Sequence, residues 1–134
     1  MATDVSVKGV RVLIVDDASA VRSLLHKVLE AEGYLVVGQL ASGTALMETI
    51  VKTSPDLVCL DYHMPGENGM ALLKQVHEAH PQVSVVMITG DHDHGLEDVA
   101  ADAGAQGFIV KPFALSKLTQ DLAQVVRARQ LLAQ

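Results

Sequence analysis

Short runs of apolar, often β-branched residues recur along the chain and constrain its fold more than any other feature. The runs are Val10–Val15, Leu35–Val37, Leu57–Leu60, Val83–Ile88 and Gly107–Val110. Runs this continuous are typical of strands buried on both faces, because a half-exposed strand would alternate apolar with polar residues. The sequence therefore predicts a parallel β-sheet that is covered on both sides.

Apolar residues at helical spacing fill the stretches between these runs. From Val21 onward they recur at i, i+3, i+4, i+7 and i+8, with Ser19 as a candidate N-cap and Gly33 as a stop signal. Four further patterns, the last of which can continue through residue 132, cover Leu46–Val51, Leu72–Ala79, Leu96–Ala103 and Leu118–Val126. Strands that alternate with helices predict right-handed βαβ crossovers and an α/β fold with helices on both faces of the sheet.

Length and composition restrict the number of domains and the class of protein. At roughly 150 residues per domain, a chain of 134 residues is expected to hold one domain, here residues 10–134 after a tail of residues 1–9, with no output domain. Hydrophobic residues make up 49% of the chain and charged residues 19%, which excludes an intrinsically disordered protein. The apolar runs are far shorter than the roughly 18 residues of a membrane span, and the first residues lack a signal-peptide pattern.

Charge and cysteine content narrow the expected partners and surroundings. The chain has 10 basic and 16 acidic residues and a net charge of −6, without a basic cluster. This balance disfavours direct binding to nucleic acid, which needs positive charge against the phosphates. A lone cysteine, Cys59, cannot form an internal disulfide or a thiolate zinc site, so a reducing cytoplasm is the expected location.

Chemically distinctive residues follow four of the apolar runs. Asp16 and Asp17 follow the first run, Asp61 the third, Thr89 the fourth and Lys111 the fifth. Ligands of doubly wound sheets bind beyond the carboxyl ends of the strands, so these side chains are expected at one edge of the sheet. Crowded carboxylates raise one another's pKa unless a cation joins them. Mg²⁺ suits the set because it prefers one or two carboxylates together with a phosphate.

The same residues would support phosphoryl transfer to a carboxylate. Asp61 is the expected nucleophile and would form an aspartyl phosphate, with Lys111 as a fixed positive charge and Thr89 as a hydrogen-bond donor. Taken singly, each aspartate is more often a helix cap or a turn residue. Capping explains a set of polar groups at four strand ends much less well, so the joint arrangement favours a functional site.

Four segments resemble the receiver domain of two-component response regulators, and the chain as a whole is similar to the single-domain chemotaxis type. The resemblance runs from about Arg11 to about Leu132. Its segments are Val12–Asp17, Leu57–Gly66 with Gly69, Val86–Gly90 and Gly104–Phe113. It implies a flavodoxin-like (βα)5 sandwich, a doubly wound α/β fold whose five parallel strands lie in the order 2-1-3-4-5 with helices on both faces.

The resemblance also implies a role for individual residues. Asp61 would be phosphorylated in a Mg²⁺-dependent reaction, and Asp61, Thr89 and Lys111 would form the catalytic set. The oxygen ligands of the metal would be Asp16, Asp17, Asp61 and the backbone carbonyl of His63. Family members are signalling proteins rather than enzymes, so catalysis would be confined to the protein's own phosphorylation and dephosphorylation.

Other residues would transmit or tune the signal. Thr89 and Phe108 match the hydroxyl and the aromatic ring that move on phosphorylation, and Lys111 is expected to precede a cis proline, Pro112. The side chains of His63 and Asp91 are expected to set the lifetime of the phosphoryl group.

The expected partners follow from the same resemblance. The phosphoryl group would come from a phosphohistidine of a sensor histidine kinase or a histidine phosphotransfer protein. The face formed by the fourth helix, the fifth strand and the fifth helix would bind a downstream protein or a second copy. Direct contact with nucleic acid or a membrane is not expected, and chemotaxis, a phosphorelay and a phosphate sink all remain open as output pathways.

Two alternative functions and one alternative site remain. A phosphorylation-independent adaptor with the receiver fold would be expected to have lost its acceptor or its lysine, whereas Asp61 and Lys111 are both present. A haloacid-dehalogenase-like phosphatase would carry an Asp-x-Asp motif after the first strand and usually a cap domain, whereas here the two acids are adjacent. The run from Asp91 to His94 could hold a transition metal, although a solvated turn is the simpler interpretation.

Overall fold

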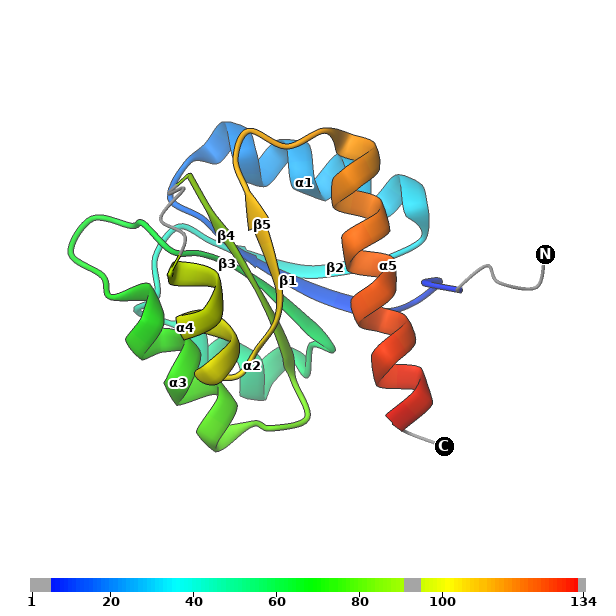
Figure 1. Cartoon of the computed structure of the whole chain (residues 1–134). Helices are drawn as coiled ribbons and strands as arrows, with labels where there is room; N and C mark the ends of the chain where they lie inside the picture. The colour runs from blue at the N-terminus through cyan, green and yellow to red at the C-terminus, as the bar shows by residue number, and fades with distance from the viewer. Residues whose placement is uncertain (1–5, 91–94, 133–134) are drawn as a thin grey trace.

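The computed structural model describes residues 6–90 and 95–132 of the chain, and strands alternate with helices throughout them (Figure 1). The elements are β1 (Arg11–Val15), α1 (Ser19–Glu32), β2 (Leu35–Leu40), α2 (Leu46–Thr53), β3 (Leu57–Asp61), α3 (Gly69–Ala79), β4 (Ser84–Thr89), α4 (Leu96–Asp102), β5 (Ala105–Val110) and α5 (Leu115–Leu132). The predicted alternation of strands and helices is confirmed.

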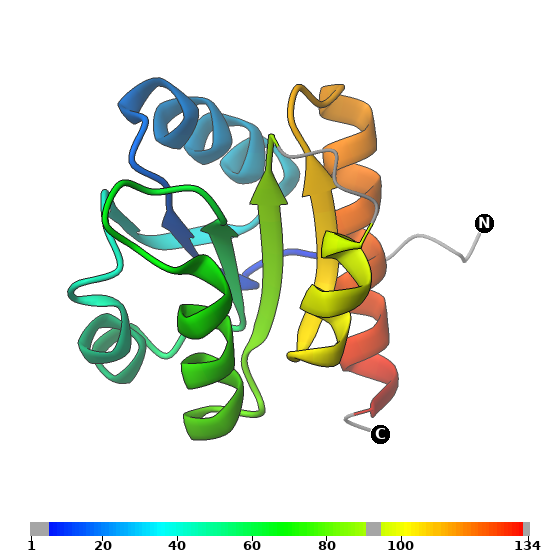
Figure 2. The same cartoon turned by 60° about the vertical axis from the view of Figure 1, so that its left-hand side comes forward.

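Within the described residues, the strands form one five-stranded sheet in the order β2-β1-β3-β4-β5, and each neighbouring pair is parallel. Helices α1 and α5 lie on one side of the sheet, and α2, α3 and α4 lie on the other (Figure 2). The predicted doubly wound α/β fold, including its strand order, is confirmed.

The core explains why the apolar runs are continuous. Val12 and Ile14 of β1 pack into the cluster beneath α1 and α5, whereas Leu13 and Val15 pack into the cluster beneath α2, α3 and α4. Every residue of the central strands β3 and β4 is buried. Between Ser84 at the start of β4 and the terminal Asp61 and Thr89, these strands are continuously apolar because both of their faces are covered, which is why they could be recognised from composition.

The edge strand β2 is longer than its apolar run predicted. Its observed range is Leu35–Leu40, and its residues are half-buried or exposed. The polar Gln39 belongs to the strand because an edge position lets its side chain reach the surface, where the amide nitrogen lies 2.6 Å from Nδ1 of His26 on α1.

The ends of α1 show one correct and one wrong prediction. Gly33 ends the helix in the left-handed conformation, with φ of 109°, which glycine adopts without a steric cost. Ser19 is the first residue of the helix rather than its N-cap, which is Ala18. The carboxylate of Asp16 accepts a hydrogen bond of 2.9 Å from the Ala18 amide, so the strand-end aspartate holds the start of the helix in place of a serine hydroxyl.

Helix α5 runs the full length of the sheet and its last turn reaches the edge opposite the carboxyl ends of the strands (Figure 1). There Nη1 of Arg129 donates to the carbonyl of Gln82 at 2.6 Å and to the hydroxyl of Ser84 at 2.9 Å.

The segment before β1 also packs on the domain, since Val7 is buried and the Ser6 carbonyl accepts a hydrogen bond from Gln130. Among the described residues, no helix combines the length and the apolar character that crossing a bilayer requires.

Candidate functional site

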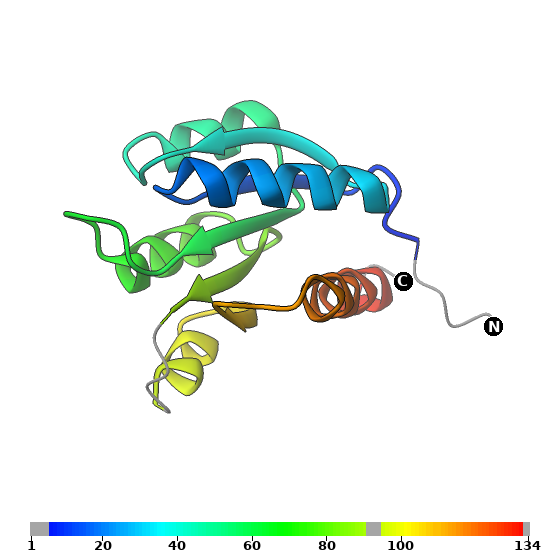
Figure 3. The same cartoon turned by 90° about the horizontal axis from the view of Figure 1, so that it is seen from above.

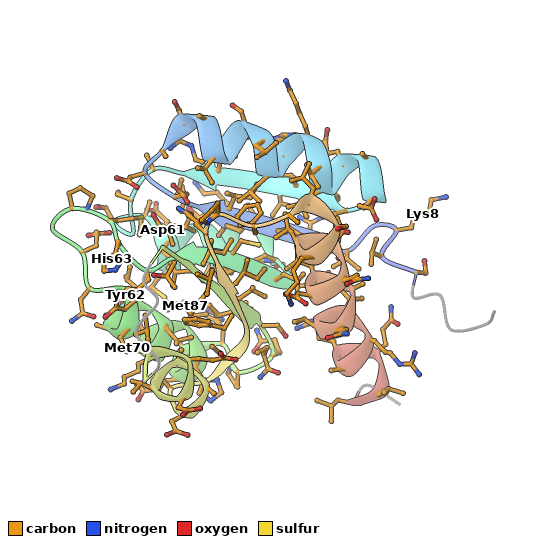
Figure 4. All side chains as sticks on the ribbon, turned by 45° about the horizontal axis from the view of Figure 1, so that its top comes forward. Lys8, Asp61, Tyr62, His63, Met70 and Met87 are labelled. Atoms are coloured by element: carbon orange, nitrogen blue, oxygen red, sulfur yellow. The ribbon has the colours of Figure 1, made fainter. Side chains whose placement is uncertain are left out.

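The carboxyl ends of the strands bring the predicted polar residues to one edge of the sheet. Asp61 is the last residue of β3, Thr89 is the last of β4, and Lys111 follows β5 directly. Asp61 pairs with Ile88, and Thr89 pairs with Val110, so these ends lie side by side. Figure 4 shows Asp61 at the end of its strand, with His63 just beyond it on the loop toward α3.

Three carboxylates meet at this edge. Asp16, Asp17 and Asp61 each offer an oxygen, and these oxygens all lie within 4.8 Å of one another. Asp16 is 1% exposed and Asp61 4% exposed, whereas Asp17 is open to solvent. Two of the carboxylates are therefore removed from water and held close to like charge, which is unfavourable unless a cation compensates them.

Lys111 supplies part of that compensation. Its Nζ lies 3.0 Å from Oδ2 of Asp16 and 3.6 Å from Oδ1 of Asp61. The Lys111 amide donates to the carbonyl of Thr89 at 2.7 Å, and the peptide bond between Lys111 and Pro112 is cis, as expected. The backbone at the end of β5 is thus held by β4, and the ammonium group is directed at the two buried carboxylates.

The surroundings of Asp61 raise the pKa of its carboxyl group above the usual range. Removal from water is the main cause, and the negative charge of Asp16 adds to it; the charge of Lys111 and the His63 amide oppose the shift. That amide donates a hydrogen bond of 3.3 Å to Oδ1 of Asp61. Lys111 and the His63 amide lower the pKa of Asp61 by less than burial and the neighbouring carboxylates raise it.

The donor set fits a hard divalent cation. Carboxylate oxygens from three residues within 4.8 Å of one another are the ligands that Mg²⁺ prefers, and the excess negative charge favours such an ion. Within residues 6–90 and 95–132, the cluster contains no nitrogen or sulfur ligand of the kind that would favour zinc or copper. The residues present therefore agree with the expectation of Mg²⁺.

The other predicted residues differ in their burial. Thr89 is fully buried, and His63 is exposed, with its ring in an edge-on contact with Tyr62 at a centroid distance of 4.6 Å. Phe108 is half-buried on β5 and lines a cavity of about 130 Å³ together with residues of α4. Asp91, and with it the possible metal-binding run through His94, lies outside the described residues.

Two contacts beside the site were not anticipated from the sequence. Nη1 of Arg22 on α1 donates to the backbone carbonyl of Asp16 at 2.7 Å. A carboxylate oxygen of Glu67, in the loop after β3, accepts a hydrogen bond from the amide of Gly43, in the loop after β2. Neither contact has a signal in the hydrophobic pattern, because both join loop or helix-start positions whose approach depends on the folded backbone.

The chain is similar to known proteins over most of its length. Residues 12–123 match the response regulator receiver domain. The chemotaxis protein CheY of Thermotoga maritima is 34% identical over 117 residues, which are 87% of this chain and 98% of that protein. Receiver domains and CheY are signalling proteins, and receiver domains generally use Mg²⁺ at an acidic pocket.

Solved structures agree with this relationship. A CheY-like receiver domain protein from Methanospirillum hungatei JF-1 is 27% identical, with a TM-score of 0.84 over 92% of this chain and 98% of that one. A chain in the complex of CheX and CheY with BeF3 and Mg²⁺ from Borrelia burgdorferi is 28% identical, with a TM-score of 0.80 over 87% and 88% of the two chains. The chain therefore belongs to the response regulator receiver domain family and is of the CheY-like type.

Proposed function

We propose that Asp61 accepts a phosphoryl group from a phosphohistidine of a sensor histidine kinase or a histidine phosphotransfer protein, in a Mg²⁺-dependent reaction. The observation that carries this proposal is the meeting of Asp16, Asp17 and Asp61 with Nζ of Lys111 at one edge of the sheet. A buried group of like charges weakens a fold unless it has a cation or substrate to bind. The acidic cluster is thus better explained as a binding site than as a structural element.

In the proposed transfer, an oxygen of the Asp61 carboxylate attacks phosphorus and forms a P–O bond while the P–N bond of the phosphohistidine breaks. The electron pair of that bond stays on the imidazole nitrogen of the donor. Lys111 holds its charge 3.6 Å from Oδ1 of Asp61, where it can stabilise the oxygens of the incoming group. Phosphoryl transfer depends largely on such positioning and electrostatic stabilisation.

We assign the binding of Mg²⁺ to side-chain oxygens of Asp16, Asp17 and Asp61 and to the backbone carbonyl of His63. When bound, the ion supplies positive charge that offsets both the carboxylates and the phosphoryl oxygens. Asp17, as the solvent-exposed member of the cluster, leaves a path by which the ion can enter. Catalysis by the chain is confined to its own phosphorylation and dephosphorylation.

We assign the response to Thr89 and Phe108. The Thr89 hydroxyl is buried at the end of β4, next to β5, on which Phe108 lies. The cavity of about 130 Å³ beside Phe108, lined also by Glu97 and Ala101 of α4, offers room for the ring to change position. A shift of these two residues would bias two states of the α4–β5–α5 face, where Val99 and Leu115 are exposed apolar residues available to a protein partner or a second copy.

Two residues are assigned to tuning the lifetime of the phosphoryl group. His63 is exposed and follows Asp61 by two positions, and Asp91 follows Thr89 by two. His63→Ala and Asp91→Ala are each expected to change the rate at which the phosphorylated protein decays. His80→Ala, at the far end of α3, is the matched control and is expected to leave the rate unchanged; unchanged decay in both test variants would refute these roles.

The proposal is tested by the mass of the intact protein after incubation with Mg²⁺ and a small acyl phosphate. The wild-type protein is expected to gain one phosphoryl group, and the gain is expected to be lost in EDTA and in Asp61→Asn. Asp121→Asn removes an aspartate from α5, far from the site, and should still gain the group. A wild-type protein that binds Mg²⁺ but neither gains mass nor binds beryllofluoride would refute the proposal and favour a phosphorylation-independent adaptor.

A further inference from the structure

The loop between β3 and α3, residues 62–68, extends beyond the end of the sheet (Figure 3). Its first half carries His63, whose amide donates to Asp61. Its middle is anchored by Met64, which is buried in the core cluster beneath α2, α3 and α4, and whose carbonyl accepts a hydrogen bond of 3.0 Å from the Glu67 amide. The loop therefore connects the acceptor strand to α3 through a turn that ends at Glu67.

The side chain of Glu67 ties this loop to a second one. Its Oε1 accepts a hydrogen bond from the amide of Gly43, in the loop of residues 41–45 between β2 and α2. A Cβ atom at Gly43 would lie 2.5 Å from Oε1 of Glu67 and 2.6 Å from Cδ1 of Leu72 on α3. The absence of a side chain at Gly43 is what allows the carboxylate and the leucine to close over this backbone.

Both ends of this connection lead to the acidic cluster. On one side, the loop of Glu67 leads back through His63 to Asp61. On the other side, the loop of Gly43 leads back to Leu40, whose carbonyl accepts a hydrogen bond of 3.0 Å from the amide of Asp16. The contact between Glu67 and Gly43 thus joins the segment that carries His63 to the segment that supports Asp16.

We propose that Glu67 is a positioning residue for the cation site, which holds the loop of His63 in place through the hydrogen bond from the Gly43 amide. The inference rests on the proposed function, in which the His63 carbonyl is a ligand of Mg²⁺. A hydrogen bond to a carboxylate is stronger than one between neutral groups. A loop that is already held in place loses less conformational freedom when its carbonyl binds an ion, so the affinity for the ion is higher.

The test compares Mg²⁺ dissociation constants, measured from the amide NMR shifts of the unphosphorylated protein during a titration. Glu67→Ala removes the hydrogen bond and the charge, and is expected to weaken Mg²⁺ binding by about tenfold, as for other residues that support metal ligands. Glu67→Gln removes the charge but keeps an oxygen that can accept a weaker hydrogen bond from Gly43, and should weaken Mg²⁺ binding clearly less than Glu67→Ala, by about threefold at most. Glu78→Ala, on the exposed side of α3, is the matched control and should not change the affinity.

A second variant approaches the same contact from the other loop. Gly43→Ala is expected to displace the Glu67 side chain and to weaken Mg²⁺ binding as Glu67→Ala does. Because the new Cβ atom would also meet Leu72, additivity is measured in a Leu72→Ala background, where the double variant should be no weaker than Glu67→Ala alone. Faster hydrogen exchange of the residue 43 amide in Glu67→Ala would support the loss of the bond. Additive effects in the double variant, or equal weakening by Glu67→Gln and Glu67→Ala, would overturn the inference in favour of independent effects or of charge alone.

The outcome also separates this inference from the proposed function. A wild-type protein that binds Mg²⁺ and is phosphorylated, while Glu67→Ala binds Mg²⁺ equally well, overturns only the role of Glu67. A wild-type protein that neither binds Mg²⁺ nor accepts a phosphoryl group overturns both.

Discussion

The substitution Asp61→Asn should stabilise the protein in the absence of Mg²⁺, although it removes the proposed phosphoryl acceptor. At 3.6 Å and an effective dielectric constant of about 20, the attraction of Lys111 for Asp61 is about 5 kcal/mol. A neighbouring carboxylate within 4.8 Å repels Asp61 by about 3 kcal/mol or more on the same basis. Asp16 and Asp17 together therefore offset the lysine, and the cost of burying the Asp61 charge remains.

An uncharged amide of the same shape avoids that cost. We expect Asp61→Asn to raise the free energy of unfolding by about 1–2 kcal/mol near neutral pH, and the midpoint of thermal unfolding by about 3–6 °C. Mg²⁺ should stabilise the wild-type protein more than the variant and so narrow the difference, because a ligand stabilises the state that binds it.

The pH dependence gives this prediction a second check. The pKa of Asp61 is raised in the folded protein, so the unfolded chain releases this proton at a lower pH than the folded protein does. Stability from this group is fully present below the unfolded pKa of about 3.9 and is lost as the pH rises through the folded pKa. The advantage of Asp61→Asn should accordingly shrink as the pH falls toward about 4.

Urea unfolding followed by far-ultraviolet circular dichroism, in EDTA and in Mg²⁺, measures these differences. Asp121→Asn is the control, because Asp121 forms a surface ion pair with Lys117 on α5 and should change stability by less than about 0.5 kcal/mol. A loss of stability in Asp61→Asn in EDTA would show that Asp61 is satisfied without a cation and would refute the reasoning.

Three further predictions concern groups that are buried or paired. Tyr34→Phe should stabilise the protein by about 1 kcal/mol, because the Tyr34 hydroxyl is buried without a hydrogen-bond partner in the described part of the chain; a lower urea midpoint than wild type would contradict this. Burial raises the pKa of the Cys59 thiol to about 12, so alkylation by iodoacetamide at pH 8 should be slow in the folded protein and fast in urea, and equal rates would contradict the burial of this side chain. Lys111→Met should lower stability in EDTA by about 2 kcal/mol or more, because Asp16 then loses its ion pair; unchanged unfolding in urea would refute that role of the lysine.

The sequence was sufficient for the parts of the fold that depend on burial. Strands β3 and β4 are covered on both faces, so their positions show directly as apolar runs. The edge strand β2 was predicted too short, because Gly38 and Gln39 interrupt the apolar run at a position where the sheet does not require burial. The prediction of Ser19 as the N-cap of α1 was wrong, since the Asp16 carboxylate accepts the hydrogen bond from the Ala18 amide at the start of this helix.

The meeting of Asp16, Asp17, Asp61 and Lys111 was predictable because parallel strands bring their carboxyl ends to the same edge. Contacts between loops were not predictable in this way. The approach of Glu67 to Gly43 depends on the path of two loops, and the hydrogen bonds of Arg129 to Gln82 and Ser84 join residues more than 40 positions apart. Neither arrangement leaves a periodic signal in the sequence.

Asp61 is the residue on which the proposed function depends most directly. The protein would be incubated with Mg²⁺ and a small acyl phosphate, treated with borohydride, digested, and analysed by tandem mass spectrometry. Borohydride reduces an acyl phosphate on aspartate to homoserine, which marks the modified position permanently. Homoserine is expected at position 61 and aspartate at positions 16 and 17. Homoserine at position 16 or 17, with position 61 unmodified, would contradict the proposed role of Asp61.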